Sequence, residues 1–187
     1  VHLSVAVHPS VAGHPSVAGP LRVAGHLRVA GDHRLAAAVS KGMEARRTGG
    51  GWIGAWNTCV WARLERGDKV EQWLKSIVGS YADNLQNRGN NQLDSNFGLT
   101  AAVAEALLQS HAGEISLLPA LPPDWATGSI SGLRARGDFE LSFKWKDGTL
   151  TEVTVLSKAG NDCILRYKDK TVKLETQKGN TYLLDDM

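Results

Sequence analysis

The stretch NQLDSNFG, residues 91–98, runs directly into the apolar segment LTAAVAEALLQS, residues 99–110. The second segment is rich in good helix formers, and its apolar residues recur at spacings of three and four. This pattern predicts a helix after Gly98, preceded by a polar loop that carries one carboxylate, Asp94. An aspartate fixed on a loop by a rigid helix can act as a general base, and it can equally cap the helix or form a turn.

Two further helices are predicted upstream of this loop. Apolar residues recur every four positions over residues 52–65, which indicates a helix buried over much of its surface. Gly67 suits the end of that helix, and Asp68 suits the N-cap of the next one. The tryptophans at 52 and 56 could form a platform for sugar rings, but they share a face with aliphatic residues and we expect them to pack. The apolar face of the second helix consists of Val70, Trp73, Leu74, Ile77 and Val78.

Residues 113–187 have the pattern of a small antiparallel β domain, which we expect to be a sandwich. Phe139, Leu141, Phe143 and Trp145 alternate with polar residues, the period of a half-buried strand. The Asp147-Gly148 pair that follows favours a tight hairpin. Further strands are predicted at residues 114–118, 151–157, 163–167, 171–175 and 181–184. The chain is therefore predicted to be an α+β protein.

Residues 4–39 consist of six consecutive hexapeptides of the type SVAGHP, with an apolar residue at every sixth position. Such repeats can build a parallel β-helix, but six units would supply only two of its coils, and several stacked repeats are needed to bury a core. Because glycine and proline recur here, we interpret residues 1–40 as a low-complexity, disordered segment. Its histidines lack the rigid surroundings of a zinc site, and we expect neither a metal site nor a cofactor.

The charges of the chain are distributed unevenly. Residues 1–40 carry three arginines and one aspartate, whereas residues 41–187 balance 18 basic against 18 acidic side chains. The globular part therefore shows no basic face, which argues against nucleic acid as a partner. No apolar run is long enough to span a membrane, and the N-terminus does not have the pattern of a signal peptide. We expect Cys59 and Cys163 to be buried as free thiols.

The segments GWIGAWNTCVWARLERGD, LDSNFGLTAAVAEALLQSHAGEISLLPALPPDW and GLRARGDFELSFKWKDGTL resemble the C-terminal part of glycoside hydrolase family 95, the α-L-fucosidase family. The resemblance implies that residues 41–112 are the last helices of an (α/α)6 barrel and that residues 113–187 are the accessory β domain. It also implies that Asp94 is the catalytic base of an inverting hydrolysis. Gln92 and Asn96 flank Asp94 and could orient it or bind a sugar hydroxyl, and they could equally satisfy backbone groups of the loop. The family usually has isoleucine and glycine beside this aspartate, where this chain has Leu93 and Ser95.

Two functions follow from this resemblance. The first is a C-terminal fragment of an inverting α-L-fucosidase-like hydrolase, inactive or nearly so alone because the family's general acid lies upstream of the matched residues. The alternative is a non-catalytic carbohydrate-binding or interaction module. The expected partner is a fucosylated glycan, and self-association through exposed helix faces is also expected. For the parent family member, the resemblance implies an extracellular or cell-wall location.

Overall fold

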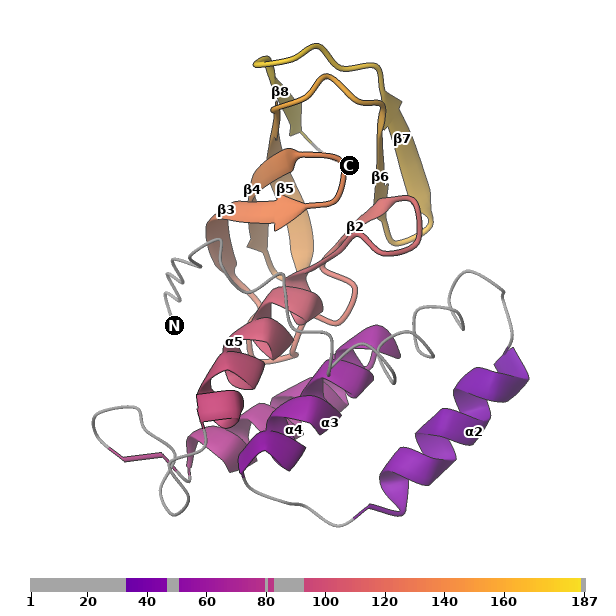
Figure 1. Cartoon of the computed structure of the whole chain (residues 1–187), viewed down its shortest axis with the longest axis vertical. Coiled ribbons are helices and arrows are strands. Elements are labelled where there is room, and N and C mark those ends of the chain that lie inside the picture. Colours follow the sequence, from indigo (N-terminus) through magenta and orange to yellow (C-terminus); the bar gives the residue numbers. More distant parts are fainter. Residues whose placement is uncertain (1–32, 47–50, 80, 83–92, 186–187) are drawn as a thin grey trace.

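The computed structural model describes residues 33–46, 51–79, 81–82 and 93–185. These residues form four helices, which gather at one side of the molecule, and two small sheets at the other (Figure 1). The α+β prediction is therefore confirmed. In the described part of the chain, no helix is both long and apolar enough to cross a membrane.

The helices are α2 (His33–Glu44), α3 (Gly51–Arg63), α4 (Gly67–Val78) and α5 (Leu93–Leu107). Helix α2 lies partly within the hexapeptide repeat, so the expectation of disorder up to residue 40 is wrong for residues 33–40. The last repeat unit, RLAAAV, is rich in alanine, the best helix former, and lacks the proline and glycine of the earlier units. Residues 1–32 of the predicted disordered segment lie outside the described residues.

Helices α3, α4 and α5 pack around one apolar core, to which the end of α2 adds Met43. The predicted face of α4 is buried at Val70, Trp73, Leu74 and Ile77, whereas Val78 is exposed. In α3 the prediction is less accurate, because Trp52 and Ile53 are exposed and the small residues Gly54 and Ala55 are buried. The expectation that Trp52 packs in the core is therefore wrong. Small residues face α5 because the two helices come close together along that side of α3.

The turn from α3 to α4 does not use the predicted signals. Glu65 takes the left-handed conformation with φ of 59°, and the Arg66 N–H donates to the Trp61 carbonyl at 3.0 Å. These features define a Schellman-type cap, in which glycine is the usual residue. Gly67 instead begins α4, where Arg66 is the N-cap and Asp68 lies in the first turn. The Asp68 carboxylate receives two hydrogen bonds from Arg66, of 2.7 and 2.9 Å.

The first sheet has the order β1 (Leu108–Gln109), β2 (Ile115–Leu117), β6 (Cys163–Tyr167) and β7 (Lys170–Leu174). The second has the order β3 (Gly128–Ala135), β4 (Phe139–Lys146), β5 (Thr149–Ser157) and β8 (Thr181–Asp185). Strands β2 and β6 are parallel, so the prediction of an entirely antiparallel domain is wrong for this pair. Side chains of both sheets form a single core.

Strand β4 has the predicted alternation, with Phe139, Leu141, Phe143 and Trp145 all buried. The two-residue turn Asp147-Gly148 joins β4 to β5, and both residues have positive φ, as tight hairpin turns require. Helix α5 leads directly into β1, and the Leu107 carbonyl at its end accepts a hydrogen bond from the Leu118 N–H at 2.8 Å. The helical part and the β part are thus joined by backbone hydrogen bonds as well as by the chain.

Candidate active site

Asp94 lies in the first turn of α5, and its side chain is exposed. The predicted loop is therefore helical from Leu93 onward, and the expectation that the helix begins only after Gly98 is wrong. A carboxylate in the first helical turn is favoured by the partial positive charge of the helix N-terminus, which explains why the helix can include this residue. Among the described residues, no hydrogen bond or ion pair holds the Asp94 carboxylate, and its side chain is exposed.

Neighbouring side chains fix the start of α5. Ser95 is fully buried, and its Oγ lies 3.2 Å from the hydroxyl of Tyr81, which follows the end of α4. The Thr100 hydroxyl donates to the Asn96 carbonyl at 3.1 Å within the helix. Asn96 itself lies two residues after Asp94 and is half-buried. Its role in sugar binding stays a prediction. Gln92, the other predicted sugar ligand, lies outside the described residues.

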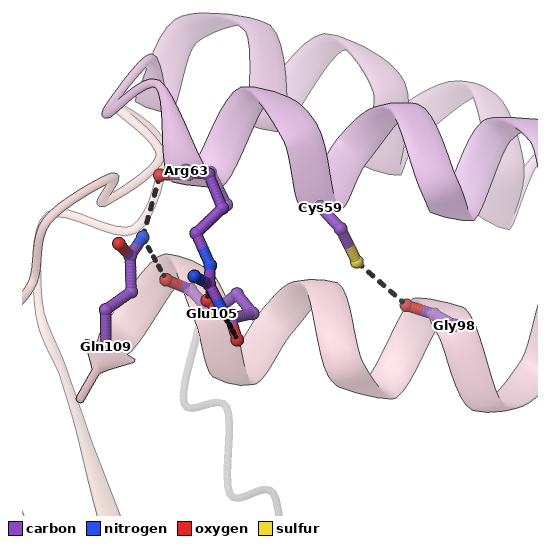
Figure 2. A network of polar contacts seen from close by, with 6 residues as sticks. Cys59, Arg63, Gly98, Glu105 and Gln109 are labelled. Atoms are coloured by element: carbon purple, nitrogen blue, oxygen red, sulfur yellow. Dashed lines mark hydrogen bonds and ion pairs between the residues drawn. The ribbon is translucent and has the colours of Figure 1, made fainter. Parts of the chain in front are cut away.

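Helix α5 contacts α3 most closely at Gly98. A Cβ atom on Gly98 would lie 2.7 Å from the Cβ of Ala55, closer than such atoms approach in proteins. The Cys59 thiol points at the Gly98 carbonyl, with a distance of 3.8 Å between Sγ and O (Figure 2). Because Gly98 lies one helical turn after Asp94, this contact sets the position of the Asp94 backbone relative to α3. Gly98 is thus needed for helix packing and does not terminate a turn.

Moving the methyl group from Ala55 to Gly98 tests how closely α3 and α5 pack at this contact. We expect Gly98→Ala to lower the free energy of unfolding by about 1–2 kcal/mol, because the overlap with Ala55 outweighs the better helix propensity of alanine. The double variant Ala55→Gly with Gly98→Ala removes the overlap and should regain most of this loss. Urea unfolding of both single variants and the double variant gives the coupling energy, and strictly additive effects would contradict a direct contact.

The far end of the same helix pair holds a polar network (Figure 2). The Arg63 guanidinium donates two hydrogen bonds to the Glu105 carboxylate, of 2.5 and 2.8 Å. The Gln109 amide donates to the Ala62 carbonyl at 2.8 Å and to the Glu105 carbonyl at 3.0 Å. These bonds lock α3 to the end of α5. Because Glu105 is paired with an arginine, it serves the packing of the two helices.

The spacing along α5 decides whether Glu105 could work together with Asp94. Eleven residues of α-helix separate the two, which corresponds to about 16 Å along the axis. The two carboxyl groups of an inverting glycosidase lie about 6.5–9.5 Å apart. Glu105 is thus too distant to be the acid partner of Asp94.

Large apolar side chains gather at the Asp94 end of the helices. Five of the six exposed large apolar residues in the described part of the chain lie in the first turns of α3 and α5 or at the end of α4. We call this set the apolar end, which consists of Trp52, Ile53, Val78, Leu93 and Phe97. Apolar side chains in such numbers at one end of a helical layer are typical of a surface that meets another surface or a ligand.

Both cysteines are free and buried, as predicted. Burial raises the pKa of the Cys59 thiol to about 12 and that of the Cys163 thiol to about 11. A thiol whose pKa is higher in the folded state stabilises the fold fully below its unfolded pKa, near 8.5, and this contribution is lost as the pH rises toward the folded pKa. Neither residue is therefore a nucleophile at neutral pH.

The effect of pH on the contribution of Cys59 to stability can be measured. Between pH 9 and 11, the free energy of unfolding of the wild type should fall relative to that of Cys59→Ala, by at most about 1.4 kcal/mol per pH unit. Guanidinium unfolding of both proteins at pH 7, 9, 10 and 11 provides the values. Cys163→Ala should show the same sign with a smaller total change. A difference that stays constant from pH 7 to 11 would show that the folded protein does not protect the Cys59 thiol.

Two family models match the chain in succession. The model of the glycosyl hydrolase family 95 catalytic domain matches residues 24–107, and that of the glycoside hydrolase family 95 C-terminal domain matches residues 109–184. The two matches meet at β1, where the helical part passes into the sheets. They place the chain among the glycoside hydrolases. Within this class, the chain belongs to glycoside hydrolase family 95.

Three curated relatives agree with this membership. Alpha-L-fucosidase 2 of Arabidopsis thaliana is 33% identical over 166 residues, which cover 81% of this chain and 20% of the relative. Probable alpha-fucosidase A of Aspergillus niger is 30% identical over 129 residues, covering 60% of this chain and 16% of the relative. The protein of the same name from Aspergillus oryzae is 31% identical over 124 residues, covering 56% and 17%. The chain thus spans about one fifth of the length of these relatives, or less.

Proposed function

We propose that this chain supplies the general base and the C-terminal β domain of an inverting α-L-fucosidase-like hydrolase acting on fucosylated glycans. Asp94 is the base, and the observation that carries the proposal is its exposed, unpaired carboxylate among the described residues, held in place by the contacts of Ser95 and Gly98. A base in an inverting glycosidase removes a proton from the water that attacks the anomeric carbon. Such a group has to be accessible to water, and the exposure of Asp94 and the fixed position of its backbone support this role.

The general acid comes from outside the described residues. The other described carboxylates of the helical part lie toward the opposite end, near the Arg63–Glu105 pair and the start of α4. One carboxylate can activate a water molecule but cannot also protonate the leaving oxygen on the other side of the bond. The described chain alone is therefore expected to hydrolyse fucosides very slowly or not at all.

The apolar end supports a further part of the proposal. Helices α3, α4 and α5 are the last helices of an (α/α)6 barrel, and the side chains of the apolar end are covered by further helices of the catalytic domain. Moving exposed apolar side chains such as Trp52 and Phe97 from water into contact with apolar partners is favourable. Without such helices, the same surface leads the chain to self-associate.

A chimera tests the catalytic role. Residues 24–184 of this chain replace the matching segment of the Arabidopsis relative, and hydrolysis of a chromogenic α-L-fucoside is measured for the chimera and for the isolated chain. We expect turnover by the chimera and none above background by the isolated chain. A folded chimera without turnover, shown to bind fucose by calorimetry, would count against the catalytic proposal. It would favour a non-catalytic carbohydrate-binding module.

A further inference from the structure

A groove lies at the junction of the helical part and the sheets, remote from Asp94. Its volume is about 420 Å³, within the range of small-molecule sites in proteins. Four segments surround it: the α3–α4 turn, the link at residues 118–123, the β4–β5 turn and the β6–β7 turn. Asp94 lies at the other end of α5, so the groove is separate from the candidate active site.

The wall formed by the link is apolar and rigid. Pro119, Pro122 and Pro123 line it together with Leu118 and Leu121. Proline has a fixed φ and no N–H, so this wall is preformed and offers C–H surface. Little conformational entropy is lost when a ligand contacts such a wall.

The opposite side of the groove carries charged groups of both signs. Glu65, Asp147 and Lys168 line it, and all three are exposed. Carboxylates accept hydrogen bonds from hydroxyl groups, and an ammonium group donates to them. With two negative charges and one positive charge, the groove does not favour an anion, and Lys168 opposes a cation. The lining thus suits a neutral ligand that is rich in hydroxyl groups and has apolar C–H faces.

The turns that present these charges are held firmly. The Tyr167 hydroxyl accepts a hydrogen bond from the Leu150 N–H at 3.1 Å and donates to the Gly148 carbonyl at 3.4 Å. The Gly148 N–H donates to the Ala126 carbonyl at 2.7 Å. The ammonium group of Lys168 lies 5.0 Å from the centre of the Tyr167 ring. These contacts tie the β4–β5 and β6–β7 turns together, so the backbone that carries Asp147 and Lys168 is fixed before a ligand arrives.

Backbone strain is also concentrated here. Five non-glycine residues in the described part of the chain have positive φ, and four of them line the groove: Glu65, Leu118, Asp147 and Lys168. The left-handed conformation is unfavourable for glutamate, leucine and lysine, and it persists only where the surroundings enforce it. Glu65 takes this conformation at the cap of α3 and Asp147 in the tight β4–β5 turn, so the groove lies where turns of several elements meet.

We propose that this junction groove binds a neutral oligosaccharide independently of Asp94. Sugar hydroxyls bind the carboxylates of Glu65 and Asp147 and the ammonium group of Lys168. The C–H face of the sugar ring packs on the proline wall. The site would hold a glycan on the chain without cleaving it.

Calorimetric titration of the full chain with a neutral fucosyl-lactose trisaccharide tests this proposal. We expect saturable binding, and Asp147→Asn should weaken it about tenfold through the loss of a charge-assisted hydrogen bond. Asparagine tolerates the left-handed conformation, so the turn should be kept. The matched control is Asp138→Asn, which changes an aspartate of φ 60° at the β3–β4 turn, outside the groove, and should bind as the wild type does.

Two further variants make the result decisive. Lys168→Asn should also weaken binding, and its amide spectrum should show that the fold is intact. Asp94→Asn should bind as the wild type does, which separates this proposal from the catalytic one. The proposal is overturned if the trisaccharide does not bind, if Asp138→Asn weakens binding as much as Asp147→Asn, or if Asp94→Asn abolishes it. Tighter binding of inorganic phosphate or of a lysine peptide than of the trisaccharide would overturn it as well.

Discussion

Replacing Gly67 with alanine is expected to lower the free energy of unfolding by about 3 kcal/mol or more. Gly67 begins α4 where the helix passes against the link between the two parts of the chain. A Cβ at this position would lie 2.2 Å from the Leu121 carbonyl oxygen and 3.2 Å from the Ala120 carbonyl carbon. Both are backbone atoms, which cannot rotate away as a side chain can, so α4 or the link has to move. Thermal and urea unfolding of the variant provide the measurement.

Gly42 is the matched control for this prediction. It lies inside α2, and a Cβ added there would meet no atom within 4 Å. Gly42→Ala should therefore raise stability by about 0.5–1 kcal/mol, because alanine loses less backbone entropy than glycine in a helix. Equal effects of the two substitutions would show that the approach of α4 to Leu121 is not tight.

The elements that could be predicted from the sequence are those whose periodicity matches their burial. Strand β4 alternates between apolar and polar residues because one side of it faces the shared core of the two sheets. Helix α4 has one apolar stripe because one side of it faces the helical core. In both cases a residue's own polarity decides the side it faces, and a local pattern is sufficient to predict the element.

The errors arise where distant parts of the chain decide the structure. Gly98 resembles the end of a turn, yet it lies within α5, where its missing side chain leaves room for Ala55, 43 positions earlier in the chain. Asn57 is polar but fully buried, and neither atom of its amide has a hydrogen-bond partner within the described part of the chain. The parallel pairing of β2 with β6 joins residues about 50 positions apart. No window of neighbouring residues contains this information.

The candidate residue Asp94 comes from the family resemblance, and its catalytic role stays a prediction, whereas its geometry could not be predicted from the sequence. The resemblance of LDSNFG to a family motif singles out Asp94, whereas its placement in a helical turn depends on contacts of Ser95 and Gly98 with other elements. The junction groove could not be predicted, because its four segments are separated by up to about 100 residues in the sequence. The only local signal was the run of prolines, which by itself indicates a linker.

Replacing Asp94 with asparagine is expected to lower turnover of the chimeric enzyme by about 10²–10⁴-fold, the contribution of a positioned general base. Asparagine has the same shape, so the start of α5 and the contact of Ser95 with Tyr81 should remain, but its amide cannot take a proton from water. Affinity for the fucoside should change little, because the loss concerns the reaction step. The effect should therefore appear in kcat rather than in KM.

Asp68→Asn provides the control for this substitution. Asp68 is also an exposed aspartate in the first turn of a helix, but it is paired with Arg66 at the opposite end of the helical part. Its replacement should leave kcat unchanged, since exposed ion pairs contribute at most about 1 kcal/mol to stability. If Asp94→Asn retains full turnover, the base is a different residue, and Asp94 serves only to stabilise the N-terminus of α5.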